Sequence, residues 1–201
     1  MTSLLRHRWV RSFRSAPWAI ALLAALLMMA PAVAHAGSAI ELGLAQLVTR
    51  ANAVVVGTPV EARSLWEQSE GRWRIVTYHR VALERVVAGK IEGSETWVRC
   101  LGGRVGDIGQ RVEGEAVLPK GKRLLLFLSP RAEGGTRVVA MAQGVWMLVK
   151  GEDGIERVQP GLQRGLLIAN AERASASAEL SGRSLEEAVV RVTAARANHV
   201  P

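Results

Sequence analysis

Short runs of alternating hydrophobic and polar residues, separated by glycine-rich turns, dominate the middle of the chain. Alternation with a period of two is typical of β-strands that are buried on one face. A β-branched run over residues 53–63 contains a glycine and a proline, which predicts a strand that is bent or bulged near Gly57. Residues 73–87 form a second strand-rich stretch, and the polar, turn-like residues 67–71 between the two runs predict a hairpin.

The following segments continue the pattern of short strands. Ala88-Gly89-Lys90 breaks the second strand. Residues 124–128 are apolar without interruption, which favours a strand buried on both faces. The further strands that we expect cover residues 95–101, 138–142, 145–150 and 155–158. Several short or bent strands between glycine-rich turns indicate a mainly β domain, either a small barrel or a sandwich.

Helix signals stand at both ends of this β-rich region. Two Ser-x-x-Glu capping boxes are present, at residues 38–41 and 184–187. Apolar residues at helical intervals follow the first box as far as Ala51, so a short amphipathic helix is expected to begin the domain. The second box predicts a helix through about Ala197. The Ala/Ser-rich stretch 171–178 before it fits either a helix or a loose linker.

The N-terminal segment has the parts of a secretory signal peptide. Four arginines precede an apolar block at residues 16–30, and Ala34-His35-Ala36 fits the small-x-small rule of a signal peptidase site. The block is shorter than the roughly 20 residues that a membrane-spanning helix needs. We therefore expect a signal peptide over residues 1–36, cut after Ala36 or two residues earlier. The mature chain is then periplasmic or secreted, without a stable membrane span.

Charge and cysteine content narrow the class of protein further. The formal net charge is +8, from 26 Lys and Arg against 18 Asp and Glu, but the four arginines of the signal segment account for half of it. We therefore expect no nucleic-acid partner, and export argues against one as well. Cys100 is the only cysteine, so no intramolecular disulfide can form, and we expect it to be buried in a strand. A catalytic thiol needs a positioned histidine, and the mature chain holds only His79 and His199.

The sequence contains no strong catalytic or metal-binding motif. Neither a His-x-x-x-His nor a Cys-x-x-Cys pair is present, so we expect no metal site and no cofactor, and we interpret His79 as a hydrogen-bonded residue on a barrel wall. The Gly-x-Ser-x-Gly signature of α/β-hydrolases is absent. Acid–base hydrolysis remains formally possible with the carboxylates Asp107, Glu113 and Glu115. The glycine-rich segment 102–111 lacks the order of a P-loop or a dinucleotide fingerprint, which favours a long loop between strands.

The succession of strand and turn segments resembles that of a known module. The segments that carry the resemblance are Ala51-Asn52-Ala53-Val54-Val55-Val56-Gly57, Tyr78 to Gly89 with its end Val86-Val87-Ala88-Gly89-Lys90, Gly121 to Leu128, and Gly144-Val145-Trp146. Together they are similar to the netrin/tissue-inhibitor-of-metalloproteinase (TIMP) type of OB-fold module, over roughly residues 45–150. The chain also resembles uncharacterised secreted bacterial proteins that carry the same succession.

The resemblance implies a small OB-like barrel, closed or partly open, with an N-terminal and a C-terminal helix. We expect this barrel domain in residues 37–160 and a helical extension in residues 161–201. In metalloproteinase inhibitors of this family, an N-terminal cysteine places its amine and carbonyl on the catalytic zinc. The expected mature chain begins with Gly37 and no cysteine, so that inhibitory chemistry does not transfer.

The tryptophans suggest where a partner binds. Trp97 and Trp146 lie in alternating strands and are expected in the core, whereas Trp66 and Trp73 flank the polar hairpin, where they either pair across it or form an exposed contact surface. We predict an exported, non-catalytic module that binds a protein, such as an exported protease, and the candidate binding residues are Trp66, Trp73, Arg104, Asp107 and Arg111. The alternatives are an exported hydrolase that uses loop carboxylates and a binder of carbohydrate or another envelope polymer. The sequence sets no oligomeric state.

Overall fold

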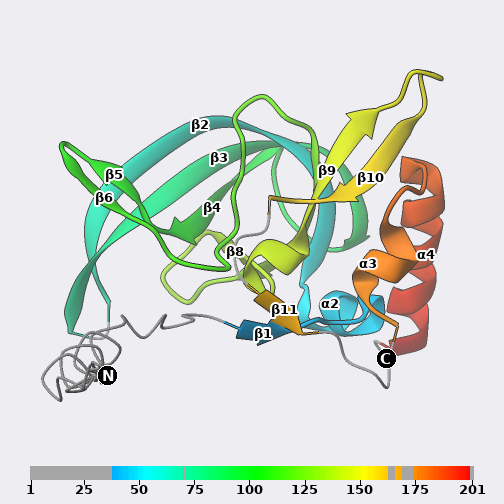
Figure 1. The fold of residues 1–201 in the computed structure, drawn as a ribbon, viewed down its shortest axis with the longest axis horizontal. Coiled ribbons are helices and arrows are strands. Elements are labelled where there is room, and N and C mark those ends of the chain that lie inside the picture. The colour runs from blue at the N-terminus through cyan, green and yellow to red at the C-terminus, as the bar shows by residue number, and fades with distance from the viewer. Residues whose placement is uncertain (1–37, 70, 163–165, 169–173, 200–201) are drawn as a thin grey trace, which may run out of the picture. The chain divides into compact units, whose positions relative to one another are not determined.

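A long two-stranded hairpin is the main element of the structure (Figure 1). The computed structural model describes residues 38–69, 71–162, 166–168 and 174–199, and the expected signal peptide, residues 1–36, lies outside them. The strands are β1 (Ser38–Ile40), β2 (Ala53–Ser69), β3 (Arg72–Gly89), β4 (Glu95–Leu101), β5 (Gly103–Val105), β6 (Ile108–Gln110), β7 (Leu124–Pro130), β8 (Thr136–Val138), β9 (Val145–Lys150), β10 (Glu156–Pro160) and β11 (Leu166–Ile168). The helices are α2 (Leu44–Arg50), the 3-10 helix η1 (Met141–Gly144), α3 (Ala176–Leu180) and α4 (Leu185–His199). The protein is therefore mainly β, as predicted.

One seven-stranded sheet, in the order β10-β9-β7-β2-β3-β4-β8, organises the described residues. Neighbours in this sheet are antiparallel except β4 and β8, which are parallel. Because β8 also pairs with β7, the strands β7-β2-β3-β4-β8 form a partial ring. β5 and β6 make a separate small hairpin, and β1 pairs in parallel with β11.

Hydrophobic side chains are buried on both faces of β7. All of residues 124–128 are buried, and alternate members belong to two different clusters. One cluster joins the sheet to α2, α3 and α4 and includes Trp146, which is 2% exposed. The other joins side chains of β2, β3, β4 and β7 and includes Cys100. These positions confirm the strand buried on both faces, the buried thiol and the core position of Trp146.

The β2–β3 hairpin is irregular near the sheet and regular toward its tip. Its register shifts between Val54 and Val55, between Val56 and Gly57, and between Pro59 and Glu61, which confirms the predicted bulge near Gly57. Residues 67–69 belong to β2, so the prediction that the turn begins at residue 67 was wrong. The reason is that residues 72–74 pair with them and extend the ladder to the tip of the hairpin.

The first helix begins later than its sequence signal predicts. Ser38–Ile40 form strand β1, and α2 begins at Leu44 after an N-cap at Gly43. Long-range partners explain the difference: β11 pairs with β1, and the amide of Gln143 donates to the carbonyl of Ile40 (3.1 Å). The expected N-terminal helix is therefore present, but the capping box at residues 38–41 was a wrong prediction of its start.

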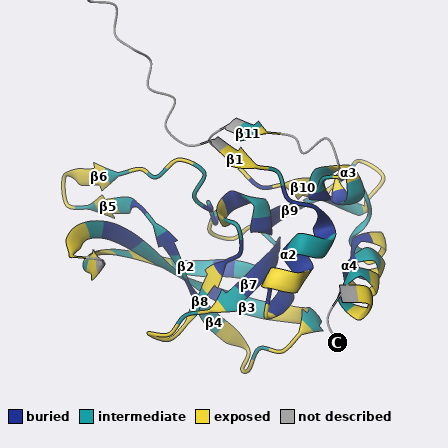
Figure 2. Cartoon of the chain, turned by 90° about the horizontal axis from the view of Figure 1, so that it is seen from below, coloured by how far each residue is buried: buried dark blue, intermediate teal, exposed yellow. Residues whose placement is uncertain are grey.

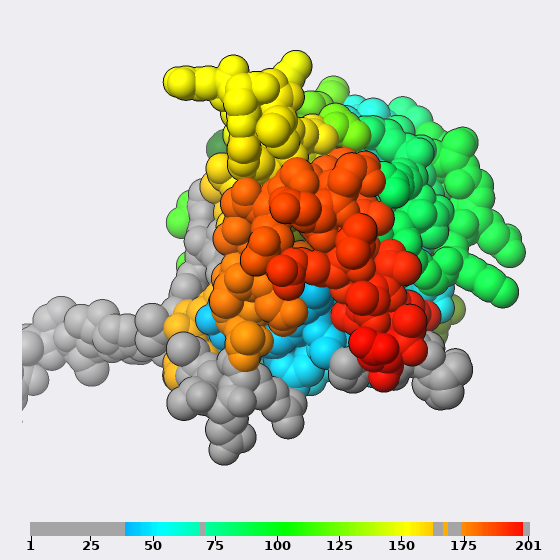
Figure 3. All heavy atoms as spheres, turned by 90° about the vertical axis from the view of Figure 1, so that its right-hand side faces the viewer, coloured from blue at the N-terminus to red at the C-terminus, as the bar shows by residue number. Residues whose placement is uncertain are grey.

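The C-terminal helix follows its sequence signal closely. Ser184 Oγ accepts from the backbone N–H of Glu187 (3.3 Å), and the Glu187 carboxylate accepts from the N–H of Ser184 (2.8 Å), which is the predicted capping box of α4. Residues 176–178 are helical, as part of α3. α3 and α4 lie over α2 in Figure 3, and Arg196 of α4 donates to two backbone carbonyls at the end of α2 (2.7 and 3.1 Å). In the described ranges, no helix is both long and apolar enough to cross a membrane.

The strand expected over residues 138–142 ends at Val138 instead. Ala140 and Met141 follow with φ angles of 53° and 57°, in the left-handed region, and η1 then leads into β9. The chain turns here because the N–H of Val139 donates to Phe127 O (2.8 Å) and the N–H of Ala142 donates to Gly114 O (2.9 Å). These contacts come from other parts of the chain, so residue alternation alone could not predict the turn.

Candidate functional site

The glycine-rich segment 102–111 contains a small hairpin, β5–β6, rather than only a loop. Val105 pairs with Ile108 across a turn in which Gly106 has a φ of 59°. In Figures 1 and 2 this hairpin and the tip of the β2–β3 hairpin lie at the same end of the described domain. The structure therefore brings together the two segments that the sequence indicated as candidate binding elements.

A close approach of backbone and hydroxyl groups seats β5 on the long hairpin. Thr77 Oγ1 donates to the carbonyl of Gly102 (2.7 Å), and Ser64 Oγ lies 2.9 Å from Thr77 Oγ1. Gly103 has a φ of 135°, and a Cβ on it would lie 2.2 Å from Thr77 Oγ1 and 2.6 Å from Ser64 Oγ. Only glycine fits this contact, so Gly103 allows the segment to lie close against β2 and β3.

Hydrogen bonds to Ile75 hold both ends of the small hairpin, at Gly102 before β5 and at Gln110 of β6. The side-chain carbonyl of Gln110 accepts from the backbone N–H of Ile75 (2.6 Å), and the carbonyl of Ile75 accepts from the N–H of Gly102 (2.8 Å). Ile75 lies beyond Val76, the last residue of β3 on this side that pairs with β4. The small hairpin thus satisfies backbone groups of β3 where β4 ends.

Trp66 and Trp73 lie on one face of the long hairpin. Trp66 pairs with Ile75 and Trp73 with Gln68, so the side chains at these positions share the face of Ser64 and Thr77, on which β5 lies. Ile75 is fully buried there, but Trp66 is 41% and Trp73 65% exposed. Ile108 of β6 is 57% exposed. The covered face therefore continues toward the tip as exposed aromatic surface.

The predicted polar residues Arg104, Asp107 and Arg111 lie on or directly after the small hairpin. Arg104 Nε donates to the carbonyl of Gly106 (2.9 Å), and its guanidinium lies 3.8 Å from the carboxylate of the fully exposed Asp107. Arg111 is exposed after β6 and lines the cavity described below. Arg104 and Asp107 thus form a weak ion pair, screened by solvent, close to Ile108.

The opposite face of the long hairpin carries a charged cluster that sequence reasoning missed. Arg99 donates to Glu67 Oε1 through Nε (2.9 Å) and Nη2 (2.6 Å), and Tyr78 Oη donates to Glu67 Oε2 (2.6 Å). Arg131 in turn donates to Tyr78 Oη (3.1 Å). The Arg99 hydrogen bonds, followed by that of Tyr78, hold the pKa of Glu67 below its ordinary value despite partial burial. The cluster ties β2, β3, β4 and the segment after β7 together.

Trp97 lies on this charged face and not in the core, so the expectation for it was wrong. It is half-buried, and the guanidinium carbon of Arg63 lies 5.6 Å from its ring centroid. Alternation places Trp97 on the side of Arg99, while Val98 and Cys100 point to the core. The strand itself was correctly predicted, but the side of the strand that carries Trp97 faces away from the core.

A cavity of about 250 Å³ has His79, Cys100 and Glu115 in its wall. Burial raises the pKa of the Cys100 thiol and of Glu115, and it lowers the pKa of His79. His79 Nδ1 is buried without a hydrogen-bond partner among the described residues, so the expectation of a hydrogen-bonded histidine was wrong for this atom. A thiol that stays protonated beside an uncharged imidazole is a poor nucleophile.

The other candidate chemistry lies in separate environments. Asp107 is exposed at the turn of β5–β6, Glu113 is exposed, and Glu115 is half-buried. His199 is the last described residue of α4. Over the described ranges, no group of three or more His, Cys, Asp or Glu side chains is placed to hold a metal ion.

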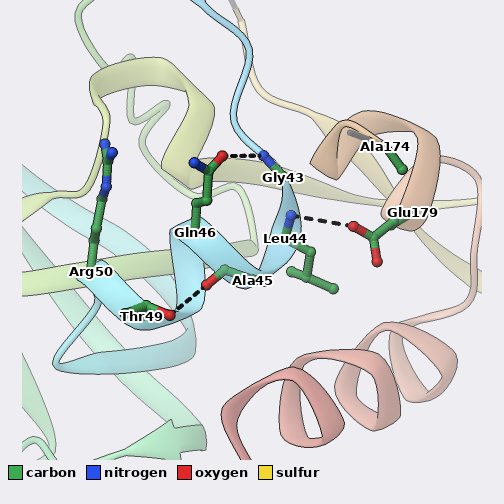
Figure 4. Close-up of a pocket in the computed structure, with 8 residues that line it drawn as sticks. All are labelled: Gly43, Leu44, Ala45, Gln46, Thr49, Arg50, Ala174 and Glu179. Carbon is green, nitrogen blue, oxygen red and sulfur yellow. Dashed lines mark hydrogen bonds between the residues drawn. The ribbon is translucent and has the colours of Figure 1, made fainter. Parts of the chain in front are cut away.

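A pocket of about 650 Å³ opens at the start of α2 (Figure 4). Polar groups at the start of α2 and on α3 are used within the chain: the N–H of Leu44 donates to Glu179 Oε1 (3.3 Å), and that of Gly43 donates to Gln46 Oε1 (3.1 Å). Thr49 likewise donates to the carbonyl of Ala45 (2.8 Å). These contacts join α2 to α3 and give the pocket a structural role.

The geometry at the tips of the two hairpins is the main guide to the function of this protein. The surface at the tips of the two hairpins combines exposed aromatic side chains, hydrogen bonds that join the two hairpins, and a charged border. No protein-family model matches the chain, and a search of curated proteins found no match to it.

Proposed function

We propose that this protein is an exported, non-catalytic module that binds another protein through the tips of its two hairpins. The contact surface, called here the hairpin surface, consists of Trp66, Trp73 and Ile108, with Arg104, Asp107 and Arg111 at its border. The observation that carries the proposal is that β5–β6 is hydrogen-bonded to the face of the long hairpin on which both tryptophans are exposed.

Physical properties of the hairpin surface suit protein recognition. Exposed tryptophans are frequent anchors of protein interfaces, and a charged border around an apolar centre is the usual arrangement. Hydrogen bonds at Gly102, Gln110 and Thr77 hold the small hairpin before a partner arrives. Binding then costs little ordering entropy, which favours affinity.

The fold that we propose is an OB-like barrel of the netrin/TIMP type in residues 37–160, followed by a helical extension in residues 161–201. Support comes from the five strands β7-β2-β3-β4-β8, which pair in turn and return to β7 through β8. OB-folds are five-stranded, partly open barrels that bind ligands through strand faces and loops. Because Gly37 stands where the inhibitors of that family carry a cysteine, we do not extend the proposal to zinc-directed inhibition.

Export is the second part of the proposal. The basic, apolar and small-x-small segments of residues 1–36 support a cleaved signal peptide and a periplasmic or secreted location. The partner that we propose is therefore another exported protein, and proteases of the same compartment are the first class to examine.

Capture of partners from the native envelope and secreted fractions tests the proposal. The C-terminally tagged chain, the double variant Trp66→Ala/Trp73→Ala and a Leu65→Ala control are compared by quantitative mass spectrometry after cross-linking. Leu65 is also exposed, but alternation places it on the opposite face of β2. We expect the double variant to lose at least about tenfold of a partner that the control retains, since each anchoring tryptophan contributes about 2 kcal/mol or more.

Other outcomes contradict the proposal. A partner retained by the double variant, at an unchanged unfolding midpoint, places the contact elsewhere. Tryptophan-dependent capture of a glycan in place of a protein favours the carbohydrate-binding alternative. Turnover of a substrate that Asp107→Asn or Glu115→Gln abolishes identifies a hydrolase.

A further inference from the structure

A second pocket, of about 590 Å³, lies where β4, β7 and β8 meet the start of η1 and the last residue of α2. We call it the arginine pocket, because its wall includes Arg50, Arg99 and Arg137. Leu101, Val138 and Met141 contribute an apolar part of the wall. The residues of the hairpin surface do not line it, so a ligand here is independent of the proposed protein contact.

Two of these three arginines have no acidic partner among the described residues. Arg99 is already paired with Glu67 (2.6 Å). Arg137 stands opposite Ser129 of β7, and its Nε donates to that neutral hydroxyl (3.3 Å). Arg50 ends α2 at the rim of the pocket and forms no ion pair with the residues that the structure describes. Two guanidinium groups therefore remain available to an anion.

The balance of charge favours a ligand with a single negative charge. Glu115 also lines the arginine pocket and accepts from the backbone N–H of Ala116 (2.9 Å). When ionised, it interacts with the guanidinium of Arg99 and adds a negative charge to the wall, which repels a doubly charged phosphate more strongly than a monoanion. A carboxylate, by contrast, matches the planar fork of a guanidinium and carries one charge.

The apolar wall suggests that the ligand has a hydrocarbon part. Val138 is buried, Leu101 is half-buried, and Met141 is exposed at the rim, where a flexible thioether can adapt to an apolar ligand. A pocket of this volume is large enough for a small organic molecule rather than a bare ion.

Backbone strain marks the same wall. Ala140 and Met141 are consecutive non-glycine residues in the left-handed region, a conformation that L-residues seldom adopt twice in succession. The hydrogen bond from the N–H of Ala142 to Gly114 O (2.9 Å) helps to hold them there. Strain of this kind gathers where a fold shapes a ligand site.

We infer that the arginine pocket binds a small organic monoanion, whose carboxylate lies between Arg50 and Arg137 and whose apolar body contacts Leu101, Val138 and Met141. This function does not depend on the hairpin surface. It places a small-molecule site in a protein that we otherwise propose to bind another protein.

Titration of the full chain with hexanoate tests the inference. Binding is followed by calorimetry at low ionic strength, because the exposed guanidinium groups are screened by salt. Hexanamide supplies the same apolar body without the charge, and inorganic phosphate supplies charge without the apolar body. The variants are Arg50→Gln and Arg137→Gln, with Lys122→Gln as a control that removes the same charge from an exposed turn.

We expect hexanoate to bind more tightly than either hexanamide or phosphate. Each arginine variant should weaken hexanoate binding about tenfold, the effect of losing one charged hydrogen bond, while Lys122→Gln leaves it unchanged. Unfolding midpoints without ligand establish that the variants are folded. The inference is overturned if hexanoate does not bind at millimolar concentration, if phosphate binds as tightly, or if folded Arg50→Gln and Arg137→Gln variants bind hexanoate like the parent chain.

Discussion

At the scale of single residues, Gly103 is the position on which the hairpin surface depends most. Its φ is 135°, and a Cβ at this position would lie 2.2 Å from Thr77 Oγ1, so no other side chain fits without movement of the backbone. The sequence analysis identified the segment as a glycine-rich loop that carries candidate binding residues. The reason for this particular glycine lies in β2 and β3, some 25 or more residues away in the chain.

Gly103→Ala is expected to lower the free energy of unfolding by about 2 kcal/mol, since it combines an unfavourable φ with a steric clash. Chemical denaturation measures this change. The matched control is Gly106→Ala, where φ is also positive but nothing lies within 4 Å of the added Cβ, so only about 1 kcal/mol should be lost. Equal losses in the two variants would show that the seat on Thr77 does not stabilise the fold.

At the scale of elements, the charged cluster around Glu67 holds the outer part of the β2–β3 hairpin to the rest of the sheet. Glu67 belongs to β2, Tyr78 to β3 and Arg99 to β4, and Arg131 follows β7. The outer part of β2 has β3 as its neighbour in the seven-stranded sheet but no strand on its other side, because β2 pairs with β7 only over residues 53–57. The cluster on one face and β5–β6 on the other compensate for the missing neighbours.

The cluster makes stability depend on pH. The pKa of Glu67 in the folded protein lies below its ordinary value of 4.5, first because Arg99 donates hydrogen bonds to it. Its contribution is therefore complete above pH 4.5 and is lost as the pH falls through the lower folded value. We expect Glu67→Gln to destabilise the protein by about 1 kcal/mol at pH 7 and to flatten the acid side of the stability profile. Urea unfolding from pH 7 to pH 3 measures both effects, and an unchanged acid slope would contradict them.

At the scale of the whole described domain, the C-terminal helices complete the hydrophobic core. Ala188 and Val192 of α4 are fully buried in the cluster that contains Leu47 of α2 and Phe127 of β7. Arg196 adds hydrogen bonds to the carbonyls at the end of α2. Helices α2, α3 and α4 thus pack together against one face of the sheet.

Val192→Ala should cost about 2 kcal/mol of unfolding free energy, because it removes buried methyl groups and leaves a cavity. Val190→Ala on the same helix is the control, since Val190 is 67% exposed and its truncation should change stability by less than about 0.5 kcal/mol. Thermal unfolding of the two variants measures the difference. A similar small loss in both would mean that α4 contributes little to the core.

The sequence by itself determined the strands of the long hairpin and the strands β4, β7, β9 and β10, where the long hairpin bulges and where α4 begins. These features follow from signals within a few residues: alternation, an uninterrupted apolar run at 124–128, glycine and proline positions, and the Ser184–Glu187 box. Such signals act on neighbouring residues, so they survive folding wherever no distant group competes with them.

Only the tertiary structure decided the features that depend on distant partners. Ser38–Ile40 became a strand because β11 and Gln143 satisfy its backbone, and Trp97 turned outward because the other side of β4 faces the core. The hairpin surface and the arginine pocket likewise join side chains from segments far apart in the chain. Local patterns determine the type of an element, but the partners of each backbone and side-chain group are chosen by packing across the whole domain.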